Sequence, residues 1–178
     1  MEDISLHMLD IAENAVRADA KTITIIITKD AGNDLLCVEV IDDGRGMDAG
    51  MLAKVHDPFF TTKHKKTGLG IPLLSQAAEQ AGGKVTVDSA PGKGTKVEVT
   101  FRWGHVDRPA IGSMADTVLT LIAGHPDLDV VYEGREGDRV FRLDTREIKS
   151  DLEGVPINAP AVLAAIREMF KEQDPFER

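Results

Sequence analysis

The chain has 178 residues and a net charge of −9 at neutral pH, which is enough length for one ordinary domain with a smaller appendage. The acidic balance argues against a nucleic-acid binder, because affinity for a phosphate backbone depends on clustered Lys and Arg. No apolar run reaches the roughly 18 residues of a membrane span, no signal-peptide pattern stands at the N-terminus, and the single cysteine, Cys37, suits a reducing compartment. We therefore expect a cytoplasmic protein that does not insert into membranes, with Cys37 in its core.

The first hundred residues alternate between helical and strand-like patterns. Apolar side chains at helical spacing predict helices over residues 5–18 and 70–81, with Gly82 and Gly83 ending the second. β-Branched and apolar runs predict strands over residues 21–28, 35–41, 84–88 and 95–101. A short helix near Asp48 and a mobile loop over 56–67 complete the pattern. This order predicts an α/β two-layer sandwich, in which helices pack on an antiparallel or mixed sheet.

The remaining residues, 104–178, predict a small C-terminal α+β module beside a first domain over 1–103. Ser113 and Asp116 form the pattern of a capping box before a helix that Gly124 ends. A hairpin over 130–143, a short helix capped by Asp144 and a last helix from about 158 to 171 follow. Four arginines alternate there with acids and are expected on a solvated surface or against a partner's phosphate. We expect docking or dimerisation from this module, and no catalytic pattern is visible in it.

Four short segments with acids and glycines follow one another in the first hundred residues. They are Asp10-Ile11-Ala12-Glu13-Asn14-Ala15, Asp42-Asp43-Gly44-Arg45-Gly46-Met47, Thr67-Gly68-Leu69-Gly70 and Gly92-Lys93-Gly94-Thr95. Short glycine patterns occur by chance in many chains, so the order and spacing of the four carry the information. Residues 5–101 resemble the GHKL ATPases, whose N, G1, G2 and G3 boxes these segments match. The resemblance implies the same helix-and-sheet order, with ATP and Mg²⁺ as ligands.

Asp10 and Asn14 are four residues apart, which places both side chains on one face of the first helix. An amide oxygen suits Mg²⁺, and the resemblance puts Asn14 at the metal-coordinating position and Asp10 at the position of the general base. Many hydrolysing members have Glu where this chain has Asp10, and Glu13 is an alternative base. Considered alone, these residues also fit the solvated face of an amphipathic helix.

Asp42 stands at the end of an apolar strand and before Gly44 and Gly46, which allow the backbone to approach a ligand closely. The resemblance implies that Asp42 accepts a hydrogen bond from the adenine amino group and that Met47 lines the same pocket. A buried acceptor of this kind disfavours guanine, whose carbonyl leaves it unpaired. A plain Asp-Gly hairpin turn is the alternative.

Thr67, Gly68, Leu69 and Gly70 lead into a helix, where free backbone N–H groups suit phosphate oxygens; capping by Thr67 is the alternative. The segment 57–63 looks like the F box and lid of histidine-kinase-type members, which implies that Phe59 lies near the nucleotide and that Lys63, Lys65 or Lys66 meets the triphosphate. A solvated charge run is the alternative for these lysines. Thr95 matches the G3 position near the adenine pocket, and an ordinary hairpin turn also explains its segment.

Three functions are open at this point. The first is an ATP-binding regulatory protein with Mg²⁺-dependent ATP hydrolysis or phosphotransfer, acting on an unidentified protein partner and able to form an ATP-dependent homodimer. The second resembles the anti-sigma-factor kinases, with Asp10 activating a protein hydroxyl. The third is a non-catalytic ATP sensor that acts through protein binding. Few residues precede the first helix, which argues against the two-helix dimerisation segment of a sensor kinase, and residues 102–178 are too few for the second domain of gyrase-type members.

Overall fold

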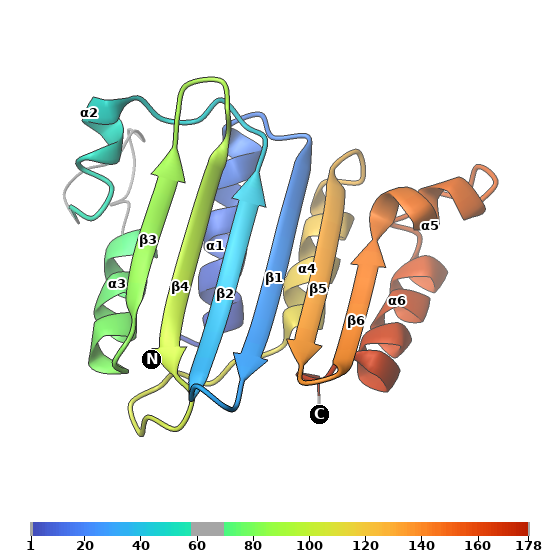
Figure 1. The fold of residues 1–178 in the computed structure, drawn as a ribbon. Helices are drawn as coiled ribbons and strands as arrows, with labels where there is room; N and C mark the ends of the chain where they lie inside the picture. Colours follow the sequence, from blue (N-terminus) through green and yellow to red (C-terminus); the bar gives the residue numbers. More distant parts are fainter. Residues whose placement is uncertain (1, 58–69, 178) are drawn as a thin grey trace.

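The structure is a computed structural model that describes residues 2–57 and 70–177 (Figure 1). Five residues predicted to contact the nucleotide lie outside these ranges, together with most of the loop predicted over 56–67. They are Phe59, Lys63, Thr67, Gly68 and Leu69.

In the described part of the chain one mixed sheet has the strand order β3-β4-β2-β1-β5-β6. β1 and β5 are parallel, and the other neighbouring strands are antiparallel. The strands are β1 (Thr22–Asp30), β2 (Leu35–Asp42), β3 (Lys84–Ser89), β4 (Thr95–Arg102), β5 (Asp129–Glu136) and β6 (Arg139–Asp144). The predicted strands of both halves are confirmed, with ends that differ by a few residues.

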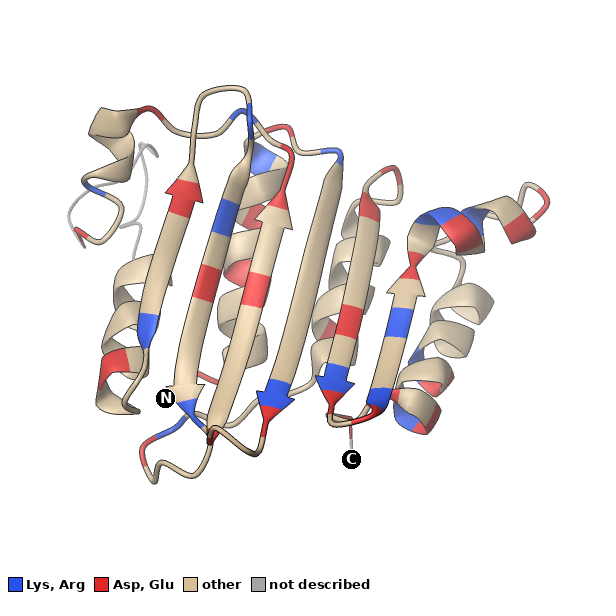
Figure 2. Ribbon diagram, viewed as in Figure 1, with Lys and Arg blue, Asp and Glu red and all other residues tan. Residues whose placement is uncertain are grey.

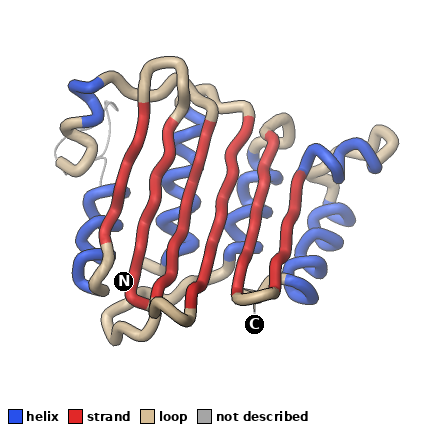
Figure 3. The backbone as a smooth tube through the Cα atoms, in the orientation of Figure 1, coloured by secondary structure: helices blue, strands red, loops and turns tan. Residues whose placement is uncertain are grey.

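Helices cover one face of this sheet, as Figures 1 and 3 show. The helices are α1 (Ile4–Arg17), α2 (Ala49–Leu52), α3 (Gly70–Gln80), α4 (Met114–Gly124), α5 (Thr145–Asp151) and α6 (Pro160–Gln173). The predicted two-layer α/β sandwich with a mixed sheet is therefore correct. Among the residues described, no helix is long and apolar enough to cross a bilayer.

Alternation along the strands explains why one face is covered. On β1, Ile23, Ile25 and Ile27 are completely buried under the helices, while the residues between them are only partly buried. Such alternation is typical of a sheet with one packed face and one open face. Charged residues recur along β2, β3 and β4 (Figure 2). Cys37 belongs to the open face, because its neighbours Leu36 and Val38 point into the core, so its expected core position is wrong. Partial burial still raises the pKa of its thiol to about 11.

The C-terminal residues extend the same sheet. β5 pairs with β1 along its whole length, from Thr22 opposite Asp129 to Lys29 opposite Glu136. The buried apolar side chains of both halves form one continuous core. The predicted α+β character of residues 104–178 agrees with this arrangement, whereas their separation at residue 103 as a folding unit stays a prediction.

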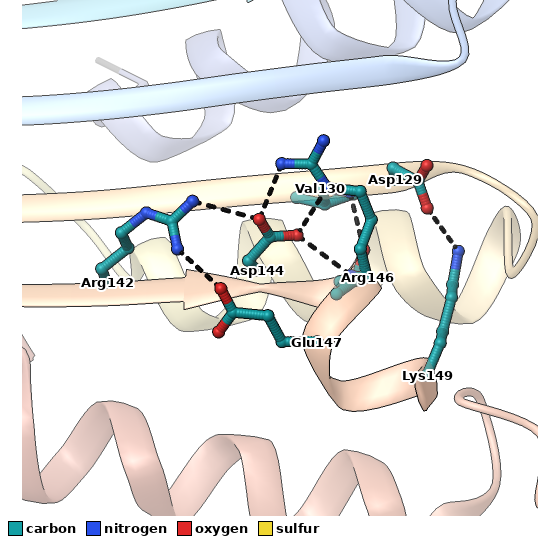
Figure 4. A network of polar contacts seen from close by, with 8 residues as sticks. Asp129, Val130, Arg142, Asp144, Arg146, Glu147 and Lys149 are labelled. Atoms are coloured by element: carbon teal, nitrogen blue, oxygen red, sulfur yellow. Dashed lines mark hydrogen bonds and ion pairs between the residues drawn. The ribbon is translucent and has the colours of Figure 1, made fainter. Parts of the chain in front are cut away.

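The four arginines expected on a solvated surface, Arg135, Arg139, Arg142 and Arg146, are paired with acids of the same half. Asp144 is almost fully buried, caps α5 by accepting from the Arg146 backbone N–H at 3.0 Å, and also binds the side chains of Arg142 and Arg146 (Figure 4). These bonds, above all the one from Arg146, lower the pKa of Asp144 to about 2. Arg135 and Arg139 pair with Glu133 and Glu136 respectively. The network supports the interpretation of a solvated, internally paired surface.

The C-terminal segment is attached to β5 by a buried hydrogen bond and to α4 by partly buried ones. The Tyr132 hydroxyl donates to Asp174 Oδ2 at 2.9 Å, and both side chains are buried. The carboxylate of Glu177 accepts from the Ser113 hydroxyl and from the Ala115 N–H at the start of α4. Burial raises the pKa of Asp174 to about 6, although the Tyr132 bond acts to lower it.

This pKa predicts a stability that depends on pH. Because the folded state holds the Asp174 proton more tightly than the unfolded chain, the group stabilises the fold fully below about pH 4 and loses that contribution as the pH rises through 6. We expect Asp174→Asn to gain stability relative to the unchanged chain between pH 5 and pH 8, by roughly 1 to 1.5 kcal/mol, because part of the contribution is already lost at pH 5. Urea unfolding at both pH values measures this difference. Asp127→Asn, at an exposed site, is the control. It should change the free energy of unfolding by the same amount at both pH values.

Candidate functional site

Helix α1 presents Asp10 and Asn14 on its exposed side. Asp3 caps the helix by accepting from the Leu6 N–H at 3.0 Å, and Ile4, Met8, Ile11, Ala12 and Ala15 turn toward the core. The predicted shared face of Asp10 and Asn14 therefore follows from the burial of the opposite side. The side-chain oxygen of Asn14 accepts from Arg17 at 3.0 Å.

Asp10 lies directly against the first residue of α3. A Cβ built on Gly70 would overlap the Asp10 carboxylate. A side chain at position 70 would therefore displace the exposed Asp10 carboxylate from this position. The structure thus brings the N-box segment of α1 next to the end of the predicted phosphate segment.

Glu13, the alternative base, has a different neighbour. Its carboxylate oxygens lie 3.1 and 3.3 Å from His125 Nε2, at the end of α4. This contact turns Glu13 toward the C-terminal half and not toward Gly70. Asp10 is therefore the better-placed carboxylate of the two.

The adjacent acids Asp42 and Asp43 have different environments at the end of β2. Asp43 accepts from the backbone N–H groups of Lys21 and Thr22, at 2.7 and 2.9 Å. Burial acts to raise the pKa of Asp43, but these bonds, together with the Asp43 backbone N–H and the charge of Lys21, hold the pKa below its ordinary value. Asp43 is thus an anchor between β2 and the start of β1.

Asp42 follows the buried residues of β2 and shares their side of the sheet, the side the helices cover. Its Oδ1 accepts from the Gly44 N–H at 2.8 Å. Burial raises the pKa of Asp42, and the backbone N–H groups of Gly44 and Thr95 oppose that rise. A half-buried carboxylate at the edge of the core has the chemistry of a selective hydrogen-bond acceptor.

The glycines of this region allow segments of the protein to approach one another. Gly46 has a φ of +70°, and a Cβ there would overlap the Ala90 carbonyl. A Cβ on Gly94 would overlap the Asp42 carbonyl, and one on Gly44 would lie 2.8 Å from the Ala18 carbonyl oxygen. In the described residues these glycines serve packing between backbone segments, and the predicted close approach to a ligand stays a prediction.

Ser89 is a residue of this site that the sequence analysis missed. The predicted strand ends at Asp88, but β3 continues to Ser89, which pairs with Thr95 across the hairpin; Thr95 in turn pairs with Asp42. The Ser89 hydroxyl accepts from the Met47 N–H at 2.8 Å and lies 2.9 Å from Thr95 Oγ1. Hairpin register, counted back from Thr95, is the signal that would have identified it.

Two of the cavities in the described part of the chain lie near α1 or the β3–β4 hairpin. The smaller, of about 190 Å³, touches Asp42, Ser89 and Thr95. The larger, of about 380 Å³, lies between α1 and α3 and is lined by His7, Leu73 and Gln76 among others. It touches no residue predicted from the motifs. The candidate site is therefore defined by Asp10, Gly70, Asp42 and Thr95 and not by the larger cavity.

A metal at this site would depend on few protein atoms. Among the described residues no group of three or more His, Cys, Asp or Glu side chains is arranged to hold an ion. Asn14 offers a hard oxygen donor on the exposed side of α1, which is the donor type that Mg²⁺ selects. This residue fits a metal whose remaining ligands are water and phosphate oxygens.

The fold and motif geometry agree with the comparison to known families. Residues 3–105 match the model of the family described as histidine kinase-, DNA gyrase B-, and HSP90-like ATPase. The chain therefore belongs to this family, the GHKL superfamily. The match includes all four motif segments and ends before α4.

The matching relatives include sensor kinases. The sensor histidine kinase ZraS of Klebsiella oxytoca is 36% identical over 88 residues, which are 49% of this chain and 19% of that protein. Sporulation kinase A of Bacillus subtilis (strain 168) is 38% identical over 95 residues, 52% of this chain and 15% of that protein. The chain thus spans less than a fifth of the length of these relatives. Among solved structures, full-length ShkA in complex with AMPPNP aligns with 58% of this chain and 22% of that chain, at 24% identity and a TM-score of 0.46.

The packing around Gly46 predicts a large effect of a single methyl group. Gly46→Ala places a side chain in a left-handed conformation and into the Ala90 carbonyl, so we expect a loss of unfolding free energy of about 3 kcal/mol or more. Gly92→Ala is the matched control, since Gly92 has a φ of +73° with open space around its Cβ position. It should cost only about 1 kcal/mol. Equal losses in urea unfolding would contradict the proposed close packing.

Proposed function

We propose that this chain binds Mg·ATP between α1, the start of α3 and the Asp42–Thr95 end of the sheet, and that it hydrolyses the γ-phosphate slowly or transfers it to a protein. One observation carries the proposal. Asp10 on α1 meets Gly70 at the start of α3, while Asp42, Ser89 and Thr95 form a polar row on the helix-covered face of the sheet.

The base half of the site rests on Asp42. Its carboxylate is half-buried, and burial strengthens its preference for a ligand that donates a hydrogen bond. The adenine amino group is such a donor, and the guanine carbonyl at the same ring position is not. Selection of adenine nucleotides follows.

The phosphate half rests on α1 and α3. Asn14 would share its side-chain oxygen with Mg²⁺, whose charge neutralises phosphate oxygens during transfer. Asp10, exposed and next to Gly70, would accept the proton of an attacking water or hydroxyl. Its aspartate side chain is one methylene shorter than glutamate, so its distance from the nucleophile decides how fast the chemistry runs.

Binding of the nucleotide would change the C-terminal half through the contacts of α1. The Thr117 hydroxyl of α4 donates to the Ser5 carbonyl of α1 at 2.9 Å, in a buried contact. β5 is paired with β1 along the same sheet. A shift of α1 on binding ATP would therefore displace residues 104–178 as well. We propose these residues as the surface for a protein partner or for a second copy of the chain.

Of the two reactions, the names of the relatives favour phosphotransfer to a protein in trans. The names of ZraS and sporulation kinase A describe kinases. Under this proposal Asp10 would activate a residue of the partner instead of water.

Binding selectivity gives the first test. Wild-type protein should bind Mg·ATP and strongly prefer it to Mg·GTP. Asp42→Asn should weaken ATP binding by about 1.5 to 3 kcal/mol, roughly 10- to 100-fold, because a hydrogen bond to a charged group is lost. Calorimetric titration measures both. Asp138→Asn, at the exposed turn between β5 and β6, is the control and should bind like the wild type. Equal affinity for ATP and GTP would contradict the proposal that Asp42 forms an adenine-selective pocket.

Turnover gives the second test and separates an enzyme from a sensor. Asp10→Asn should keep ATP affinity but lose about 10²- to 10⁴-fold in ADP release or protein labelling, because it removes the general base. Asn14→Ala should instead weaken Mg·ATP binding. Glu13→Gln should leave turnover within a few-fold, since Glu13 faces His125. If the wild type and Asp10→Asn release ADP or label protein equally slowly, both alone and with cell extract present, that result would contradict the catalytic proposal and support the non-catalytic ATP sensor.

A further inference from the structure

The Ser89 hydroxyl is surrounded by three polar atoms at hydrogen-bond distance. The Met47 N–H lies at 2.8 Å, the Gly94 carbonyl oxygen at 2.8 Å and Thr95 Oγ1 at 2.9 Å. A serine hydroxyl has one hydrogen to donate and two lone pairs to accept with. Three neighbours therefore use its whole capacity.

The directions of these bonds follow from counting hydrogens. The Met47 N–H only donates and the Gly94 carbonyl only accepts, so Ser89 accepts from the former and gives its single hydrogen to the latter. The remaining contact with Thr95 can then form only if the Thr95 hydroxyl is the donor. The hydrogen of Thr95 is thereby turned toward Ser89, and its lone pairs are left for other partners.

Thr95 stands directly opposite Asp42, and both side chains share the helix-covered side of the sheet. The Thr95 backbone N–H acts to lower the pKa of the Asp42 carboxyl, against the effect of burial. We propose that Ser89 is a specificity-determining residue that, by taking the Thr95 hydrogen, makes the Asp42–Thr95 pair present hydrogen-bond acceptors alone to the purine. Ser89 acts through Thr95 and is a positioning residue.

This arrangement selects the group at position 6 of the purine ring. A 6-amino group donates hydrogen bonds to such acceptors. A 6-oxo group is itself an acceptor, so at this position it is repelled by their lone pairs and is bound less well. If Ser89 did not hold the Thr95 hydrogen, the hydroxyl would rotate and donate to the 6-oxo group. The inference rests on the proposed function, since it requires that the purine of ATP faces Asp42.

ATP and ITP are the suitable probes, because they share the ribose and triphosphate and differ in the amino or oxo group at position 6 and in the hydrogen that the oxo form carries on N1. We expect Ser89→Ala to reduce the ratio of ATP to ITP affinity at least about fivefold, mainly by improving ITP binding, since one neutral hydrogen bond is gained. Titration calorimetry with Mg²⁺ measures both affinities. Ser150→Ala is the matched control, because Ser150 is exposed on α5, where it bonds to the Glu147 carbonyl, and this variant should keep the wild-type ratio.

A second variant tests the same hydrogen directly. Thr95→Val removes the hydroxyl with little change of shape, and it should weaken ATP binding while leaving ITP binding unchanged or improved. A hydroxyl free to donate would instead make Thr95→Val weaken both. Combining Ser89→Ala with Thr95→Val should abolish the ITP gain of Ser89→Ala, because the rotating hydroxyl is gone.

Different results would overturn the proposed function and the role of Ser89. Wild-type protein that binds neither nucleotide overturns the proposed function and this inference with it. Wild-type protein that prefers ATP, combined with a folded Ser89→Ala variant that keeps the wild-type ratio or loses both affinities equally, overturns the role of Ser89 alone. If Ser89→Ala does not fold, Thr95→Val decides: a loss of ATP affinity alone supports the inference, and an equal loss for both nucleotides overturns it.

Discussion

The packing of α1 on the sheet is the interaction on which the rest of the structure depends. Its apolar side, from Ile4 to Ala15, is buried in the common core and fixes the rotation of the helix. Asp10 and Asn14 must then face outward, Asp10 against the start of α3, while Glu13 meets α4. A single buried stripe thus decides which neighbour each polar residue of this helix receives.

The hairpin between β3 and β4 organises the other half of the site in a similar way. Its register brings Ser89 and Thr95 into one row with Asp42 of β2. Because one face of the sheet is buried, a register shift by one residue would turn this row to the open face. Gly46 and Gly94 allow the connecting segments to lie close enough for the Met47 N–H to reach Ser89. Apolar packing on the same strands therefore holds the polar row in place.

Continuity of the sheet joins the family domain to the residues beyond it. The family match ends at residue 105, yet β5 lies parallel to β1, the strand that follows α1. Buried contacts such as that of Tyr132 with Asp174 then attach the last residues of the described chain to β5. A partner bound to the C-terminal half would be connected to α1 through ordinary strand pairing and helix packing.

The sequence by itself determined the family, the sandwich of helices on a mixed sheet and the shared face of Asp10 and Asn14, because local periodicity and motif spacing depend on residues close together in the chain. Only the tertiary structure decided that β5 joins β1, that Cys37 lies on the open face, that Glu13 faces His125 and that Ser89 directs the Thr95 hydroxyl. Each of these depends on which distant segments pack together. Strand order, register and the direction of a hydroxyl are set by burial and hydrogen-bond capacity summed over the whole fold.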